Sequence, residues 1–91
     1  MKVRVHVTVQ GRVQGVAFRN YAQAMAQRLD VSGWVRNLSI GDVEGCFEGE
    51  DHAVSELVKW CRTGPPAARV DNLVVREGIY SGEFAGFSIR F

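Results

Sequence analysis

Cysteine and histidine are scarce in this sequence, with two residues of each, which limits the metal and redox chemistry it can support. Cys46 and Cys61 lack the close spacing of a metal knuckle or of a CxxC redox motif. Neither histidine lies near a cysteine, since His6 falls in an alternating stretch and His52 at an expected helix start. We therefore predict no metal site and interpret both cysteines as structural thiols, with any bond between them left open.

Long apolar runs and a strong net charge are also missing. No segment approaches the roughly 18 apolar residues that cross a bilayer, and Met1 leads directly into an alternating pattern rather than a signal-peptide core. The formal net charge of +1 comes from scattered charges, without a basic run or an interleaved aromatic stripe. We expect a cytoplasmic protein with no nucleic-acid partner and no membrane partner.

Glycine, in contrast, occurs twice in a segment that is informative about ligand binding. This segment runs from Gly11 to Arg19 and reads GRVQGVAFR. Glycine adopts positive φ without strain, so successive backbone N–H groups can converge on one anion. A helix-like run follows, and the N-terminus of a helix carries partial positive charge. Arg19, in the first turn of that helix, adds a planar fork of donors that fits two phosphate oxygens. The segment predicts a cradle for a phosphate-sized anion.

The same segment excludes two common phosphate chemistries. A Walker loop needs Lys-Ser or Lys-Thr after its second glycine, whereas Gly15 is followed by Val16 and Ala17. A phosphatase of the Cys-x₅-Arg type needs a cysteine six residues before Arg19, and Val13 stands there. Taken alone, a Gly-x-x-x-Gly pattern is more typical of a tight turn beside a solvated arginine, so the cradle needs support from the rest of the chain.

Hydrophobic periodicity predicts the order of the secondary-structure elements. Alternation over residues 2–10 predicts a strand, and apolar residues spaced by three and four over 18–29 predict an amphipathic helix. The remaining expectations are strands at 34–38 and 42–48 joined through Gly41, a helix over 51–61 capped by Asp51, a strand at about 69–76 and a terminal strand at 87–91.

This order, β-α-β-β-α-β with a short extra strand, predicts one α+β domain over residues 1–91. We expect a ferredoxin-like split βαβ sandwich, a mostly antiparallel sheet with both helices on one face. In that arrangement a third strand separates the first two, and the loop after the first strand meets the end of the second at one sheet edge. With strands about 4.8 Å apart, these parts are separated by about 10 Å, which a phosphate with Arg19 and Asn37 can span.

Two motifs carry a family resemblance. One is GRVQGVAFR at 11–19, and the other is GWVRN at 33–37 continuing into GDVE at 41–44. With GPPAARV at 64–70 and GFSIRF at 86–91, the chain resembles the acylphosphatase family over essentially its whole length. The family usually carries an acidic residue where Ile40 stands, so we expect a changed hairpin tip and unchanged chemistry.

The resemblance implies hydrolysis of the carboxyl-phosphate anhydride of acyl phosphates, without a metal or an organic cofactor. It assigns water orientation to Asn37 and phosphoryl binding to Arg19 and to the backbone N–H groups of the loop residues Gln14, Gly15, Val16, Ala17 and Phe18. An acyl phosphate has a good leaving group, so positioning and charge stabilisation suffice without a general base. The expected partner is a small acyl phosphate, inorganic phosphate or sulfate is expected to fit the same cradle, and we start from a monomer.

Two other functions remain open at this point. A non-catalytic module that binds phosphate or carbamoyl phosphate is compatible with the cradle, because fold alone does not fix function, although Asn37 favours turnover. An RNA-recognition module needs paired aromatic and basic residues on its central strands. The sequence offers Val5, Val7 and Val9 with a single Phe47 instead. Arg12 and Arg36 are interpreted as solvated or scaffold residues.

Overall fold

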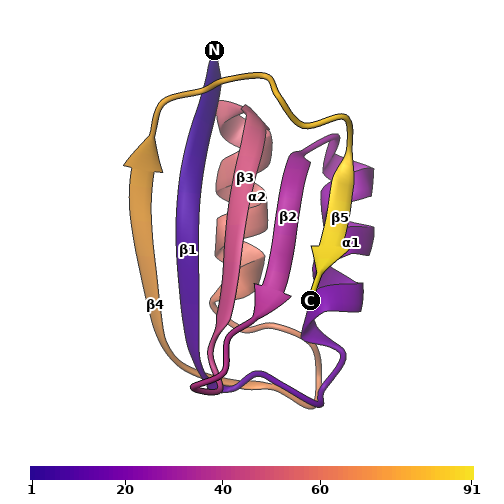
Figure 1. Cartoon of the computed structure of the whole chain (residues 1–91), viewed down its shortest axis with the longest axis vertical. Helices are drawn as coiled ribbons and strands as arrows, with labels where there is room; N and C mark the ends of the chain where they lie inside the picture. Colours follow the sequence, from indigo (N-terminus) through magenta and orange to yellow (C-terminus); the bar gives the residue numbers. More distant parts are fainter.

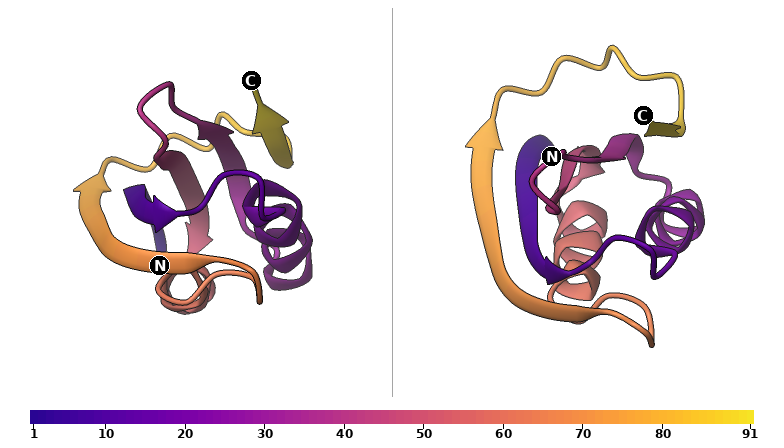
Figure 2. Two further views of the ribbon diagram at one scale, coloured as in Figure 1. Left: turned by 90° about the horizontal axis from the view of Figure 1, so that it is seen from below. Right: turned by 60° about the horizontal axis from the view of Figure 1, so that its bottom comes forward.

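Five strands and two helices, described over residues 1–91 by a computed structural model, follow the predicted order. The elements are β1 (Lys2–Arg12), α1 (Phe18–Leu29), β2 (Ser32–Asn37), β3 (Val43–Glu50), α2 (Asp51–Cys61), β4 (Arg69–Gly78) and β5 (Phe87–Arg90). The sheet has the order β4-β1-β3-β2-β5, and both helices cover the same face of it (Figures 1 and 2). The ferredoxin-like α+β fold is thereby confirmed.

Strand β3 lies between β1 and β2 and is antiparallel to both, so β1 and β2 run in the same direction. Strand β4 is antiparallel to β1, while β5 is parallel to β2. As a result, the loop after β1 and the end of β2 lie at the same end of the sheet, as Figure 1 shows. The predicted meeting of these two segments is therefore confirmed.

The core fills the space between the sheet and the helices. Val7 and Val9 of β1 and Phe47 of β3 point toward the helices and are almost fully buried, as is Leu57 of α2. Burying one such side chain stabilises the fold by about 1.5–3 kcal/mol. The Phe18 and Trp60 rings, 5.1 Å apart between centroids, join the two helices. Phe18 thus anchors the start of α1, directly after the loop of interest.

Element boundaries differ from the predictions in two informative places. Strand β1 continues to Arg12, because its bulge between Gln10 and Gly11 lets two further residues pair with β4. A Cβ on Gly11 would lie 2.2 Å from the Arg69 carbonyl oxygen, so this glycine permits a close approach of two strands. Asp51 does not cap α2, because it is the first helical residue and Glu50 occupies the N-cap position.

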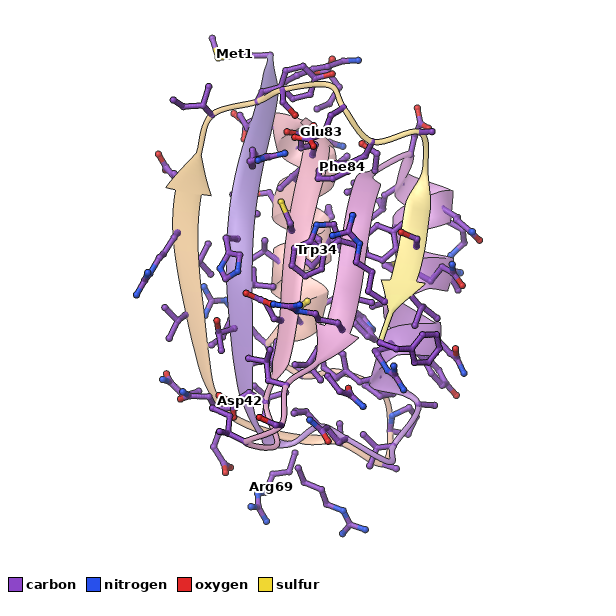
Figure 3. The ribbon with its side chains drawn as sticks, in the orientation of Figure 1. Met1, Trp34, Asp42, Arg69, Glu83 and Phe84 are labelled. Carbon is purple, nitrogen blue, oxygen red and sulfur yellow. The ribbon has the colours of Figure 1, made fainter.

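A buried carboxylate fixes the connection from β4 to β5, which crosses one end of the sheet (Figure 1). The fully buried Glu48 accepts hydrogen bonds from Arg4 Nε at 2.7 Å, from the Ser81 N–H at 2.9 Å and from the Gly82 N–H at 3.0 Å. Burial opposes ionisation, but the hydrogen bonds from Ser81, Arg4 and Gly82 outweigh it and hold the pKa of Glu48 below its usual value. Figure 3 shows neighbouring Glu83 and Phe84 at this end of the molecule.

Candidate functional site

A small cavity of about 110 Å³ lies where the β1–α1 loop, the first turn of α1 and the end of β2 meet. Its lining is Val13, Gly15, Ala17, Phe18, Arg19, Asn20 and Asn37. The structure therefore brings together five of the seven predicted site residues. Gln14 and Val16 do not line the cavity, whereas Val13 and Asn20 do and were not predicted.

The loop of residues 13–17 buries two of its side chains and leaves its backbone N–H groups unused. Val13 and Val16 are 1% and 8% exposed and belong to the core. Gly15 and Ala17 both have positive φ, 73° and 63°. None of the N–H groups of residues 13–17 donates a hydrogen bond to another part of the chain. The side chain of Val16 is packed in the core, so only its backbone is available to a ligand.

The conformation of Ala17 is unusual, because a left-handed backbone is uncommon for a residue with a Cβ atom. Ala17 is the N-cap of α1 and forms no side-chain capping hydrogen bond. The first N–H groups of a helix have no partner within the helix, and here no acidic residue occupies the first turn to offset their partial positive charge. The start of α1 therefore presents N–H groups and partial positive charge toward the cavity.

Arg19 adds a full positive charge beside these N–H groups. Its Nη1 donates to the Arg90 carbonyl oxygen of β5 at 3.3 Å, and its guanidinium carbon lies 5.2 Å from the centre of the Phe91 ring. No carboxylate lies within ion-pair distance of Arg19. The C-terminal strand thus holds this guanidinium without neutralising it.

Asn37 is the last residue of β2 and pairs with Val43 of β3. The turn that follows is closed by two backbone hydrogen bonds, from the Leu38 N–H to the Asp42 carbonyl oxygen at 2.8 Å and from the Gly41 N–H to the Leu38 carbonyl oxygen at 3.1 Å. Ile40, at the tip, is 78% exposed. The turn closes without the acidic residue usual in the family, and Ile40 extends into solvent.

The Gln14 side chain makes a contact that was not predicted. Its side-chain Nε2 donates to the carbonyl oxygens of Leu38 at 2.7 Å and of Asp42 at 2.9 Å, so the side chain reaches the hairpin after Asn37. Figure 3 shows Asp42 at the sheet end where this hairpin lies. Sequence reasoning did not detect this contact, because nothing in a local pattern reports which distant carbonyl groups a glutamine meets.

The lining of the cavity contains one titratable side chain, Arg19, and no carboxylate, imidazole or thiol. Arg36 directly precedes Asn37, but its side chain forms an ion pair with Glu44 at 2.6 Å. Arg12 is exposed, in agreement with its interpretation as a solvated residue. No group of three or more His, Cys, Asp or Glu side chains is placed to hold a metal ion. The site can therefore supply donors and positive charge, and its chemistry is that of anion binding.

Two features lie away from this site. A larger cavity of about 360 Å³ is lined by residues of β1, α2 and β4 and contains none of the predicted site residues. Cys46 and Cys61 are both free and buried, and burial raises the pKa of the Cys61 thiol to about 12. None of the helices is long and apolar enough to cross a membrane.

Comparisons with known proteins agree on one family. A sequence model of the acylphosphatase family matches residues 5–89. The chain is 56% identical to an acylphosphatase of Geobacter sulfurreducens over 91 residues, which is the full length of both proteins. It superposes on an acylphosphatase from Coxiella burnetii with a TM-score of 0.93 at 40% identity, covering 98% of this chain and 93% of the other. An acylphosphatase from Bacillus subtilis also gives 0.93, at 34% identity and 98% and 99% coverage.

Proposed function

The chain belongs to the acylphosphatase family and hydrolyses acyl phosphates, and we propose that Arg19 and the β1–α1 loop hold the phosphoryl group while Asn37 orients the attacking water. The observation that carries this assignment is the shared cavity. Arg19, the unused N–H groups of the loop and the Asn37 amide converge there from three different elements. Arg19 and the loop N–H groups offer the hydrogen-bond donors that phosphoryl oxygens require, and the Asn37 carboxamide offers an acceptor for the water beside them.

In this mechanism, the phosphoryl oxygens accept hydrogen bonds from the Arg19 guanidinium and from the backbone N–H groups of residues 14–18. The oxygen of the Asn37 carboxamide accepts a hydrogen bond from the water and aims the water at phosphorus. Attack forms a new P–O bond and breaks the P–O bond to the acyl oxygen, so that the carboxylate leaves with the bonding electrons. The product phosphate takes up the proton that the water loses.

The lack of a general base in the lining suits this substrate class. A carboxylate is a good leaving group, so the reaction needs donors placed around the developing charge more than it needs proton abstraction. The phosphoryl group's own oxygens are available to accept the proton from the water. A pH–rate profile that reveals an essential enzyme base near neutrality would contradict this step.

The size of the cavity supports recognition of the phosphoryl group alone. At about 110 Å³ it is smaller than the roughly 300–1,000 Å³ of pockets that enclose a whole drug-sized ligand. The acyl group then lies outside the cradle, and acyl phosphates with different acyl groups share one binding mode. Inorganic phosphate and sulfate fit the same cradle.

We further propose that the enzyme works without a metal ion, because Arg19 and the positive end of α1 supply the charge that a metal would otherwise provide. Residues 1–91 act as one acylphosphatase domain, which is cytoplasmic and monomeric. Its partner is a small molecule, not a nucleic acid or a membrane. Its nearly balanced charge, with a formal net value of +1, supports this choice.

The test is hydrolysis of benzoyl phosphate in the presence of a chelator, with p-nitrophenyl phosphate as the unactivated control substrate. We expect rapid turnover of benzoyl phosphate by the wild type and a loss of about 10²-fold or more in Asn37→Ala, the scale of one preorganised group. Asn72→Ala is the control. It removes a carboxamide of the same kind from an exposed position on β4 and should leave turnover unchanged. Bound phosphate without turnover would instead indicate a non-catalytic binding module.

A further inference from the structure

The Gln14 side chain connects the two parts of the proposed site. The backbone of Gln14 belongs to the β1–α1 loop, and its carboxamide nitrogen donates to the carbonyl oxygens of Leu38 and Asp42. A carboxamide nitrogen carries two hydrogens, so both are used, at 2.7 Å and 2.9 Å. These are the hydrogen bonds that join residues 13–17 to the hairpin connection at 38–42.

The hairpin itself does not need Gln14 to form its turn. The Leu38 carbonyl oxygen also accepts from the Gly41 N–H, and the Asp42 carbonyl oxygen also accepts from the Leu38 N–H. Each carbonyl oxygen has two lone pairs, so it accommodates both donors. Gln14 therefore adds a second donor to each end of an already closed turn, and its effect is to fix where that turn lies relative to the loop.

This placement matters because β1 and β2 are not paired with each other. Strand β3 separates them, and the β1–β3 register ends at Val9 opposite Val43, before the loop begins. Asn37 directly precedes Leu38, so any shift of the hairpin moves the Asn37 backbone with it. Val43 of β3 pairs with both Val9 and Asn37, so the sheet fixes the Asn37 backbone relative to β1, but no sheet hydrogen bond joins the hairpin to the loop that follows β1.

We propose that Gln14 is a positioning residue whose side chain sets the location of Asn37 relative to the phosphoryl-binding loop, and through Asn37 the aim of the water. This inference rests on the proposed function. It assigns to the Gln14 side chain a role distinct from that of its backbone N–H. A displacement of about 1 Å between reacting groups lowers rates by up to about 10²-fold. We therefore expect loss of the Gln14 side-chain contacts to lower kcat.

The first variant is Gln14→Met, which keeps the length of the side chain and removes both N–H donors. We expect kcat for benzoyl phosphate to fall roughly 10-fold, less than the approximately 10²-fold loss from removing Asn37 itself. The KM and the inhibition constant of inorganic phosphate should stay within about twofold, since the phosphoryl contacts come from the backbone and Arg19. A loss confined to phosphate affinity, with kcat intact, would overturn the inference.

Gln23→Met is the matched control. Gln23 is also half-buried, and its Nε2 also donates to a backbone carbonyl oxygen, that of Phe87 at 3.0 Å, but it ties α1 to β5. We expect its kcat to match that of the wild type under conditions where thermal melting shows all variants folded. Equal kcat losses in both variants would show a general effect of removing such a hydrogen bond and would overturn the inference.

A second variant, Gln14→Glu, gives a readout specific to donor chemistry. Ionised glutamate would set a carboxylate against two carbonyl oxygens, with no hydrogen to share, whereas the protonated form regains one donor. The ratio of its kcat to that of the wild type should therefore rise as the pH falls toward the pKa of the new carboxyl group. A ratio that does not change with pH would count against a donor role.

A double-mutant cycle separates failure of this inference from failure of the proposed function. In the Asn37→Ala background, Gln14→Met should cost little further activity, because the group that it positions is gone. Fully additive losses would overturn the positioning role alone. If Asn37→Ala by itself retains turnover, the proposed mechanism fails, whatever the Gln14 variants do.

Discussion

Arg19 and Asn37 line one small cavity although they belong to different elements, the first turn of α1 and the last residue of β2. Arg19 is held by the Arg90 carbonyl oxygen, and Asn37 by the β2–β3 ladder. The Arg19 side chain and the Asn37 backbone are therefore anchored independently. This independence allows their contributions to be separated by mutation.

Arg19→Gln should weaken phosphate binding and abolish turnover, because it removes the positive charge that meets the phosphoryl oxygens. Asn37→Ala should leave phosphate binding nearly normal while lowering kcat by about 10²-fold or more. The measurement is the inhibition constant of inorganic phosphate, determined beside kcat for each variant. An equal loss of phosphate affinity in both variants would refute this division of roles.

Gly15→Val should lower kcat/KM strongly while costing about 1–3 kcal/mol of folding free energy, the scale of one strained backbone residue. Gly15 has a φ of 73°, which a β-branched residue rarely adopts, yet nothing lies within 4 Å of an added Cβ. The loop must therefore change its backbone, and the core is not disturbed. Gly86→Val is the control, since that position is equally open and lacks positive φ. Full activity of Gly15→Val would show that the loop does not close on the ligand.

Glu48→Gln should destabilise the protein by about 2 kcal/mol at neutral pH, the scale of losing a charge-assisted hydrogen bond. The folded-state pKa of Glu48 lies below its usual value. Its ionised form therefore stabilises the fold above the unfolded pKa of about 4.3, and this contribution disappears as the pH falls through the folded-state pKa. The difference between the melting temperatures of wild type and variant should shrink as the pH falls below about 4.3. A constant difference across that range would contradict the assignment.

Both thiols should be inert toward a disulfide reagent such as dithionitrobenzoate at pH 8 in the folded protein. Cys61 is fully buried with a pKa raised to about 12, and burial also raises the pKa of Cys46, which is 6% exposed. Both raised pKa values lower the amount of thiolate, the reactive form, and burial limits access of the reagent to it. Two thiols per chain should react once denaturant is added. Rapid reaction of one thiol before unfolding would show that its segment opens in the native state.

The fold was predictable because its signals are local. The spacing of apolar residues placed α1 at Phe18–Leu29, the bounds that the structure gives. Alternation also placed β1, but not its extension to Arg12, since that extension depends on a bulge and on pairing with the distant β4. Asp51 was wrongly taken as a cap because its type suits that position, whereas tertiary contacts moved the helix start by one residue.

The candidate site was predictable in outline and not in detail. Strand order alone placed Asn37 at the same sheet end as the loop, which the cavity lining bears out geometrically. The inward burial of Val16 and the reach of Gln14 to the hairpin depend on the exact path of the loop. Glu48 could not be singled out either, because its partners at Ser81 and Gly82 lie in a connection without periodicity.

The sheet is open, and β4 is one of its two edge strands. Only β1 pairs with β4, so the N–H and C=O groups of alternate residues of β4 are left unpaired on its other side. Such an edge is a template on which a second chain can add a strand. The charged side chains at Arg69, Asp71, Arg76 and Glu77 oppose that addition. The charges along this edge thus protect the protein from aggregation, and neutralising them would lower its solubility at high concentration.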